Sequence, residues 1–565
     1  MTKKSKILRI ACAQIDVTVG DLQENSKKII SAIQKAKNEK ADLIVFPECI
    51  ISGYPPEDLM HKGHFVRDVK NAADKITKET QGITAVIGCV YPDHDGKAYN
   101  SAVIYNNGRL IDVYNKHELP NYGVFDENRY FTEGGKKIVF EKDGFCFGVT
   151  ICEDIWVKNG PYIDLAKAGA DLILNISASP YYAGKMNIRY DIAKECAKTA
   201  KTYLCYCNMI GGQDELVFDG GSFVMNPQGI VISSAKEFEE DLLITDIPLM
   251  RKKPKKYGKV VIKHLLGTVL EKKPVKPKKF KRSSEVEEIY KALVLGARDY
   301  ARKNGFQKAV MGLSGGIDSA LVAKIAVDAL SSENVICVSM PSKYSSKGTQ
   351  SDARKLAKNL DVNFFEIPIE KTFTAYMEML DKMFKCAKPN IAEENLQARI
   401  RGNTLMALSN KFGWLVLSTG NKSETAVGYT TLYGDMAGGF AVIKDVKKTL
   451  VYKLAEYVNT KSKAMCIPLS VIKRAPSAEL RFNQKDQDSL PAYDILDSIL
   501  SAYVERDMRR YDIRVKGASS EEISNVVNLV DKNEYKRRQA PPGIKITPKA
   551  FGRDRRMPIT NGYKD

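Results

Sequence analysis

Two short motifs, far apart in the chain, each follow an apolar run with the composition of a β-strand. The first run, residues 145–151, ends at Cys152. The second run, residues 308–313, leads into the glycine-rich stretch 314–319, after which a helical pattern begins. Polar groups at strand ends are typical of α/β domains, in which several strand ends meet at one crevice. Two such motifs in one chain predict two α/β domains, each with its own active site.

Length and composition agree with a protein of several globular domains. A chain of 565 residues is too long for one hydrophobic core. Its 44% hydrophobic and 27% charged residues are typical of a soluble globular protein. No apolar run approaches the roughly 18–20 residues that cross a membrane. The apolar run after the basic N-terminus is interrupted by Arg9 and Asp16, which is unlike a signal peptide. We therefore expect a cytoplasmic protein without a membrane partner.

The positive charge is concentrated in one segment. Of the formal net charge of +19, +13 comes from residues 251–282, which hold 14 Lys and Arg against one Glu. No basic face with interleaved aromatic residues, and no known nucleic-acid-binding module, accompanies these charges. Charge runs usually form solvated segments, so the sequence favours a basic linker between domains and no nucleic-acid partner.

Eleven cysteines occur without a CxxC pair. This pattern predicts neither a metal site nor a disulfide framework. Most of the cysteines lie in apolar runs, where we expect buried, reduced thiols.

The order of predicted elements divides the chain into four parts. Residues 1–250 alternate strand-like and helix-like segments and predict an α/β domain with a layered, mixed sheet. Residues 251–282 form the predicted linker. Residues 283–540 alternate strands and helices in the βαβ manner, which predicts a doubly wound parallel sheet with its ligand at the carboxyl ends of the strands. In the tail, 541–565, Pro541 and Pro542 exclude a helix, so we expect extended chain.

Three polar residues each follow an apolar strand in the first domain: Glu48, Lys116 and Cys152. Strand ends of one sheet converge, so an acid, a cation and a thiol can meet there. Glu48 would take the proton from Cys152, and Lys116 would stabilise the oxyanion as the thiolate attacks a carboxamide. Ammonia then leaves, and water hydrolyses the thioester with Glu48 as base. This chemistry requires no histidine.

These residues and their surroundings resemble the nitrilase superfamily, whose Glu-Lys-Cys triad has the same order. The resemblance rests on Phe46-Pro47-Glu48, on the run 116–131 that begins at Lys116, and on Cys152-Glu153-Asp154. It implies that the first domain has the α-β-β-α layers of that superfamily and acts as a glutaminase.

The stretch 314–319 reads Ser-Gly-Gly-Ile-Asp-Ser, between a strand and a helix. Its glycines let backbone N–H groups approach an anion, and the helix N-terminus favours negative charge. The spacing and the lysine of a Walker loop are absent. The stretch resembles the pyrophosphate-binding loop of the ATP pyrophosphatases. The resemblance implies that the second domain has an adenine nucleotide alpha hydrolase-like fold. Such enzymes adenylate a carbonyl oxygen and then admit a nitrogen nucleophile.

Further runs narrow the resemblance to NAD⁺ synthetases over residues 300–540. Three runs carry this resemblance: residues 418–424, residues 433–439 and the polar helix 393–402. The first of them ends at Glu424. Glu424 and Asp318 are predicted oxygen ligands for Mg²⁺.

Taken together, the two halves resemble the glutamine-dependent NAD⁺ synthetase family. That family converts deamido-NAD⁺, ATP and glutamine into NAD⁺, AMP, diphosphate and glutamate. Ammonia passes between its two sites through an internal tunnel. The resemblance also implies a homo-oligomer. The resemblance implies that Mg²⁺ is the cofactor and implies these binding residues: for L-glutamine Tyr122, Ser179 and Lys185; for ATP Gly312, Leu313, Ser314, Gly315, Gly316, Ile317, Asp318, Ser319 and Thr419; for deamido-NAD⁺ Asn395, Glu424 and Lys536.

Three alternatives stay open from the sequence. One is an amidotransferase with a different acceptor, which a thermal-shift screen with deamido-NAD⁺ would separate. Another is a synthetase whose first domain has lost activity, although the intact triad argues against this. The third is a nucleic-acid-binding protein that uses residues 251–282, which would show salt-sensitive binding.

Overall fold

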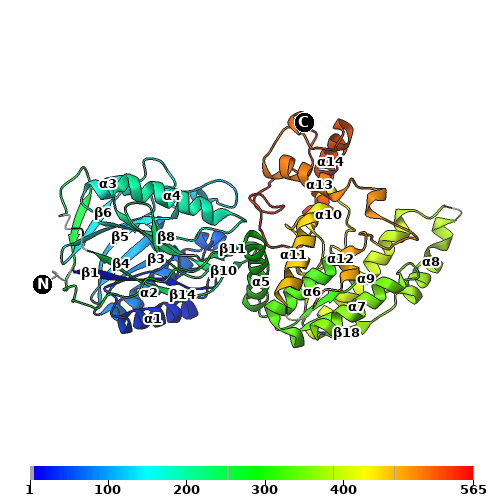
Figure 1. Cartoon of the computed structure of the whole chain (residues 1–565), viewed down its shortest axis with the longest axis horizontal. Coiled ribbons are helices and arrows are strands. Elements are labelled where there is room, and N and C mark those ends of the chain that lie inside the picture. The colour runs from blue at the N-terminus through cyan, green and yellow to red at the C-terminus, as the bar shows by residue number, and fades with distance from the viewer. Residues whose placement is uncertain (1–5, 249, 251–252, 386, 463–464, 564–565) are drawn as a thin grey trace. The chain divides into compact units, whose positions relative to one another are not determined.

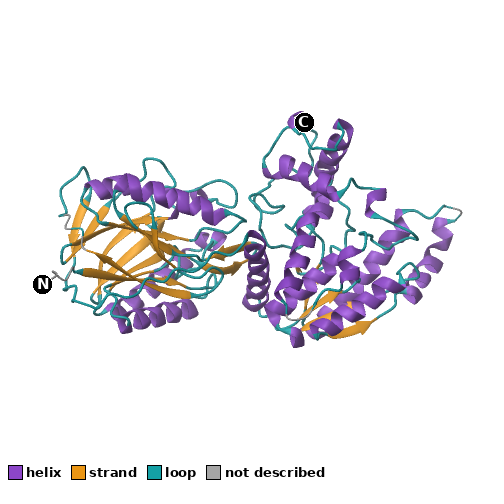
Figure 2. Cartoon of the chain, in the orientation of Figure 1, coloured by secondary structure: helices purple, strands orange, loops and turns teal. Residues whose placement is uncertain are grey.

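The computed structural model describes residues 6–248, 250, 253–385, 387–462 and 465–563. The chain forms two compact units: Met1–Gln213 with Val217–Ser283, and Asp214–Leu216 with Ser284–Asp565. The first unit is rich in strands, whereas helices dominate the second (Figure 2). Residues 251–252 of the predicted linker and 564–565 of the predicted tail lie outside the described residues. No helix in the described part of the chain is both long and apolar enough to span a membrane.

Two sheets form the centre of the first unit. The strands of the six-stranded sheet follow the order β14-β1-β2-β3-β4-β5, and those of the seven-stranded sheet the order β13-β12-β9-β8-β7-β6-β15. A short hairpin, β10–β11, forms a separate two-stranded sheet. The strands are β1 (Ile7–Gln14), β2 (Leu43–Val45), β3 (Thr84–Pro92), β4 (Ala98–Asn106), β5 (Arg109–Asn115), β6 (Ile138–Lys142), β7 (Phe145–Ile151), β8 (Leu172–Ser177), β9 (Tyr203–Asn208), β10 (Ile210–Gln213), β11 (Leu216–Asp219), β12 (Phe223–Met225), β13 (Val231–Ser234), β14 (Asp241–Pro248) and β15 (Val261–His264).

The core of this unit lies between the two sheets, where side chains from both inner faces are buried, among them Ile10, Val86, Phe147 and Leu174. The outer face of the seven-stranded sheet packs against α3 (Tyr162–Lys167) and α4 (Lys185–Ala200). Helices α1 (Leu22–Asn38) and α2 (Gly63–Ile76) lie on the other side, with α2 against β3 (Figure 1). The predicted α-β-β-α layers are therefore confirmed.

Most described lysines of the basic segment after β14 are exposed, but parts of the segment pack within the first unit. Its described residues up to Ser283 belong to the first unit, and β15 pairs in parallel with β6. The Lys272 ammonium pairs with the Asp42 carboxylate, and Arg9 donates to the Lys273 carbonyl oxygen at 2.7 Å. Residues 261–264 inside the basic run form the edge strand of the sheet, and Lys263 and Lys272 pair with carboxylates of the first unit. The net charge of the segment could predict neither the strand pairing nor these ion pairs.

A five-stranded sheet, with every described strand pair parallel, forms the centre of the second unit. Its order is β18-β17-β16-β19-β20, so the chain winds outward in both directions from β16, and the strand order reverses between β16 and β19. Ligands of doubly wound sheets bind at this switch point. The strands are β16 (Ala309–Gly312), β17 (Val335–Ser339), β18 (Asn363–Glu366), β19 (Leu415–Ser418) and β20 (Phe440–Ala441).

Helices cover this sheet. Helices α5, α6 and α11 pack together, and α9 packs on β16 and β19. The tail is irregular, as predicted, but part of it packs against the second unit. Gly543 forms an isolated β-bridge with Ala441, and the side chains of Ile544 and Ile546 are buried. The helices are α5 (Glu285–Lys303), α6 (Ile317–Leu330), α7 (Lys347–Leu360), α8 (Glu370–Phe384), α9 (Ile391–Phe412), α10 (Lys422–Val427), α11 (Lys448–Lys461), α12 (Leu469–Lys473), α13 (Tyr493–Leu500), α14 (Ser520–Lys532) and α15 (Glu534–Arg537).

Candidate active sites

The structure brings the predicted triad together in the first unit. Glu48 lies just beyond β2, Lys116 directly follows β5, and Cys152 begins the 3₁₀ turn Cys152–Ile155 after β7. All three are buried. Lys116 Nζ lies 2.7 Å from Glu48 Oε1. Strand ends from the two sheets thus place an acid, a cation and a thiol in one buried cluster.

Neighbouring groups hold the Glu48 carboxylate in one orientation. Its Oε2 accepts a hydrogen bond from the backbone N–H of Ala178 at 2.8 Å. Its Oε1 accepts one from Asn100 Nδ2 at 2.7 Å, in addition to the ion pair with Lys116. A general base must be held in a fixed orientation, and these contacts fix the orientation of the Glu48 carboxylate.

Cys152 adopts a left-handed backbone conformation, with φ at 42°. This is uncommon for a residue with a side chain and places the thiol at a sharp turn. Burial, with the charge of Glu48, raises the pKa of Cys152 well above its usual value, while Lys116 acts in the opposite direction. The free thiol is therefore protonated and needs a base before it can attack.

A second glutamate, Glu127, was not predicted as a site residue. Its Oε1 accepts hydrogen bonds from Lys116 Nζ at 2.9 Å and from Tyr54 OH at 2.9 Å. Burial raises the pKa of Glu127 to about 7, although Lys116 opposes the shift. Burial alone would lower the pKa of Lys116, but the charges of Glu127 and Glu48 outweigh it and raise that pKa well above its usual value. No periodicity in the sequence marks Glu127.

Two of the three predicted glutamine-binding residues, Tyr122 and Lys185, contact the segment that follows Cys152. Tyr122 is exposed, and its hydroxyl lies 3.0 Å from both carboxylate oxygens of Glu153. Lys185 Nζ lies over the Trp156 ring, 4.2 Å from its centroid. Ser179 is buried and follows Ala178, the residue bonded to Glu48.

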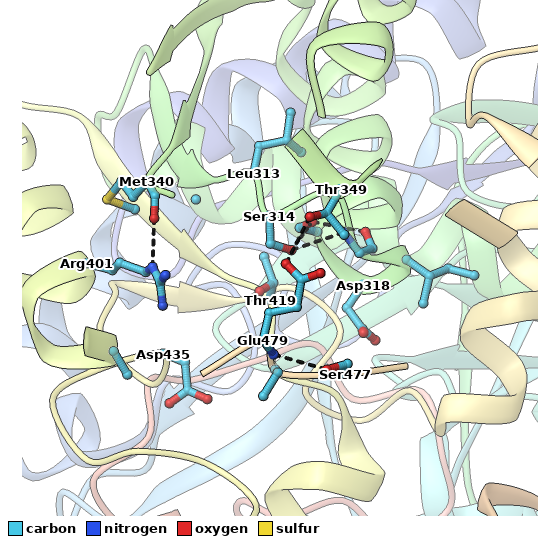
Figure 3. A pocket seen from close by; sticks show the side chains of 18 of the residues that line it. Leu313, Ser314, Asp318, Met340, Thr349, Arg401, Thr419, Asp435, Ser477 and Glu479 are labelled. Atoms are coloured by element: carbon cyan, nitrogen blue, oxygen red, sulfur yellow. Dashed lines mark hydrogen bonds between the residues drawn. The ribbon is translucent and has the colours of Figure 1, made fainter. Parts of the chain in front are cut away.

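In the second unit, a cavity of about 310 Å³ lies at the switch point between β16 and β19 (Figure 3). Residues from the ends of both strands line it, as do α9 and the segment 474–480. Its lining includes all of the predicted ATP-binding residues and Glu424: Gly312, Leu313, Ser314, Gly315, Gly316, Ile317, Asp318, Ser319, Thr419 and Glu424.

Gly315 shows why the glycine-rich loop needs its composition. Its φ is +81°, and a Cβ there would lie 2.1 Å from the carbonyl oxygen of Thr349. Neither the conformation nor the space admits a side chain. Within the loop, Ser314 Oγ accepts from the backbone N–H of Gly316 at 3.1 Å and lies 3.1 Å from Ser319 Oγ. The loop is compact and presents polar groups at the start of α6.

Asp318 and Glu424 share a lysine that sequence reasoning missed. Lys448 Nζ lies 2.5 Å from Asp318 Oδ2 and 3.0 Å from Glu424 Oε1. Burial raises the pKa of Glu424 to about 7; Lys448 opposes this shift and Asp318 adds to it. Two neighbouring carboxylates beside a phosphate site suit Mg²⁺, which binds proteins through one or two carboxylates and takes its other ligands from phosphates and water. Lys448 follows another lysine, so nothing in the sequence singled it out.

Asn395 and Lys536 do not belong to the described cavity wall. Asn395 Oδ1 accepts from Thr431 Oγ1 at 2.9 Å, and Thr431 lines the cavity. Lys536 Nζ donates to the carbonyl oxygens of Gly428 and Thr430 at 2.8 and 2.9 Å. Both residues therefore contact the segment beside the cavity.

Arg401, also missed, lines the cavity from α9 (Figure 3). Its Nε donates to the Met340 carbonyl oxygen at 2.9 Å. Burial lowers the pKa of Arg401 to about 10, with the charge of Glu479 opposing the shift. A buried guanidinium on the wall favours an anionic ligand.

Comparisons with known proteins match both halves. The carbon-nitrogen hydrolase family model matches residues 9–257, and the NAD synthase model matches residues 289–540. A glutamine-dependent NAD(+) synthetase from Thermotoga maritima is 48% identical over an alignment of 575 positions. The alignment covers 99% of this chain and 100% of that protein.

Two solved structures align over nearly the whole chain. A glutamine-dependent NAD+ synthetase from Acinetobacter baumannii, in complex with adenosine diphosphate, is 43% identical with a TM-score of 0.75, and the match covers 99% of both chains. One from Cytophaga hutchinsonii, 21% identical with a TM-score of 0.82 over 98% of both chains, has the same fold. Since both family models match and a relative is 48% identical over nearly the whole chain, the chain belongs to the glutamine-dependent NAD(+) synthetase family.

Proposed function

We propose that this chain is a C–N ligase that converts deamido-NAD⁺ into NAD⁺, with ATP as the energy source and glutamine as the nitrogen donor. The observation that carries the proposal is the pairing, in one chain, of a buried Glu48–Lys116 ion pair beside Cys152 with a nucleotide cavity in the second unit. The first site releases ammonia, and the second forms the amide.

In the glutaminase reaction, Glu48 takes the proton of Cys152 as the sulfur attacks the side-chain carboxamide of glutamine. Lys116, held protonated between Glu48 and Glu127, stabilises the negative charge on the carbonyl oxygen. The C–N bond breaks, Glu48 returns the proton to the departing ammonia, and a thioester remains. Water, activated by Glu48, then releases glutamate.

We assign glutamine binding to Tyr122, Ser179 and Lys185. In support, Tyr122 contacts Glu153 and Lys185 contacts Trp156, two residues that closely follow Cys152. Their proposed role is to bind the part of glutamine that does not react. Ser179 adjoins the backbone group that orients Glu48.

In the synthetase reaction, a carboxylate oxygen of deamido-NAD⁺ attacks the α-phosphorus of ATP, and diphosphate leaves. Ammonia then attacks the carbonyl carbon, and AMP leaves with the bond electrons. The loop 314–319 binds phosphates through its backbone and serine hydroxyls, and Thr419 contacts ATP from the neighbouring strand end. Lys448 and Arg401 add fixed positive charge near the transferred group.

We assign Mg²⁺ to Asp318 and Glu424, the pair of carboxylates on the cavity wall. When bound, the ion would neutralise negative charge on the phosphate oxygens. We also assign deamido-NAD⁺ contacts to Glu424, Asn395 and Lys536. The latter two orient the segment 428–431, from which Thr431 faces the cavity.

We further propose that the enzyme works in the cytoplasm, where the thiol of Cys152 stays reduced, and forms a homo-oligomer. In support of self-association, several large apolar side chains are exposed in the region of β18, α8 and α9, among them Phe365, Met379, Met383 and Ile391. Light scattering of the purified protein would give its subunit number.

The acceptor is tested by measuring AMP and amide product with ATP, Mg²⁺ and ammonium, while deamido-NAD⁺ is compared with other nucleotide and amino-acid carboxylates. The proposal predicts turnover with deamido-NAD⁺. A folded protein that turns over only with another acceptor would refute it.

A further inference from the structure

The carboxylate of Asp154 connects the two segments that carry Lys116 and Cys152. Asp154 is fully buried in the 3₁₀ turn after β7. Its Oδ2 accepts hydrogen bonds from the Tyr114 hydroxyl at 2.6 Å and from the backbone N–H of Ile151 at 2.8 Å. Its Oδ1 accepts from two further backbone N–H groups, those of residues 117 and 118, at 3.1 and 3.0 Å.

These four donors come from different sheets. Tyr114 is on β5, at one edge of the six-stranded sheet, and residues 117 and 118 follow that strand. Ile151 is the last residue of β7, inside the seven-stranded sheet. The bonded N–H groups directly follow Lys116 and directly precede Cys152. One buried side chain therefore bonds to both the segment that carries the cation and the segment that carries the nucleophile.

We infer that Asp154 is a positioning residue of the glutaminase: it holds the Lys116 and Cys152 segments at the spacing that the attack on glutamine requires. The inference rests on the proposed function. Burying a carboxylate is favourable only when hydrogen bonds satisfy it, and here both oxygens have two donors each. Small displacements of reacting groups lower the rate by large factors. Loss of hydrogen bonds to Asp154 should therefore slow the chemical step more than it weakens glutamine binding.

The test is Asp154→Asn in the full-length protein. The amide keeps one acceptor oxygen, and its NH₂ group faces either the N–H of Ile151 or those of residues 117 and 118, so one segment loses its anchor. We expect kcat for glutamine-dependent NAD⁺ synthesis to fall about 100-fold while KM for glutamine changes less than threefold. Synthesis from ammonium should be unchanged. Tyr114→Phe removes one of the four bonds and should lower the same kcat about fivefold.

The matched control is Asp171→Asn. Asp171 is also buried, but it precedes β8 and accepts from the backbone N–H of Cys146 at 3.4 Å, at the opposite end of β7. This variant should keep kcat within twofold. An Asp154→Asn enzyme with normal kcat overturns the inference, as does one whose ammonium-dependent activity falls equally. If Asp154→Asn does not fold, Tyr114→Phe decides: unchanged kcat overturns the inference.

Cys152→Ala, assayed in parallel, separates the two claims. If it still uses glutamine, Cys152 is not the nucleophile and the proposed glutaminase mechanism fails; if neither it nor wild type forms NAD⁺ from glutamine or ammonium, the proposed function fails. If it cannot use glutamine while Asp154→Asn is normal, only the positioning role fails.

Discussion

At the scale of residues, the glutaminase site depends on one buried lysine between two carboxylates. Lys116 is within 3 Å of both Glu48 and Glu127, and all three are buried. Isolated, each charge would be costly to bury; together they satisfy one another and keep Lys116 protonated. The arrangement leaves Glu48 held in place by other donors, while Glu127 serves mainly to hold the lysine.

The variant Glu127→Gln tests whether Glu127 serves to hold Lys116 in place. Without the second carboxylate, Lys116 loses part of what positions it, so we expect glutamine-dependent kcat to fall about 10- to 100-fold, the range for a weakened oxyanion donor. Ammonium-dependent synthesis should be unaffected. The exposed Glu133→Gln serves as control. Equal activity of the two variants on glutamine would contradict the role given to Glu127.

Glu424 gives a prediction for pH. Its pKa in the folded protein is about 7, against 4.5 ordinarily, so between these values the folded state binds a proton that the unfolded state does not. Stability from this group is fully present below about pH 4.5 and is lost as pH rises through about 7. Glu424→Gln removes the titration. In the absence of nucleotide, its Tm relative to wild type should rise by a few degrees between pH 5 and pH 8.

Calorimetry at pH 5, 6, 7 and 8 measures that difference, with Glu378→Gln, on the exposed surface of α8, as control. A Tm difference that stays constant across this range would show that Glu424 is not the titrating group.

Residues that follow strands could be predicted, and their partners could not. Glu48 and Cys152 follow apolar runs, so their positions at strand ends could be predicted. Their strands, β2 and β7, lie in different sheets, so the two residues meet through the packing of the sheets and not, as the sequence suggested, at the edge of one sheet. Glu127 and Lys448 reach their sites because irregular segments fold back, and no local pattern in the sequence encodes this.

At the scale of elements, the loop between β16 and α6 makes the cavity wall that depends most on backbone shape. Gly315→Ala forces a Cβ into the carbonyl oxygen of Thr349 at a φ of +81°. We expect ATP-dependent synthesis to fall at least about 100-fold, because the loop must move away from its phosphate-binding geometry. Glutamine hydrolysis, measured as glutamate release, should persist.

The control for that variant is Gly305→Ala, in the same unit. Its φ is +80°, but a Cβ there would meet no atom within 4 Å. It therefore carries the conformational cost, about 1 kcal/mol, without the collision. If both variants make NAD⁺ at similar rates, the close approach of the loop to Thr349 does not matter for catalysis.

Elements with strong periodicity were predictable, and the segment after β14 was not. Most of its described lysines are exposed, in agreement with a solvated segment, but residues 261–264 pair with β6 and Lys272 pairs with Asp42. Whether a lysine is solvated or paired depends on carboxylates distant in sequence, and a count of charges in a segment contains no such information.

At the scale of the whole molecule, the chain carries two reactions in two units that differ in architecture. The first unit layers two sheets for thiol chemistry, and the second winds a parallel sheet around a nucleotide cavity. The central claim is that ammonia made by the first is the nitrogen used by the second. It follows that supplying ammonium should make the first site dispensable.

The most direct measurement is NAD⁺ formation from deamido-NAD⁺, ATP and Mg²⁺ by wild type and Cys152→Ala, each with glutamine and with ammonium. Cys146→Ala, a buried cysteine on β7, controls for loss of a core thiol. We predict that Cys152→Ala loses activity on glutamine and keeps it on ammonium, while Cys146→Ala keeps both. Activity of Cys152→Ala on glutamine, or its loss on ammonium with the fold intact, would contradict the account.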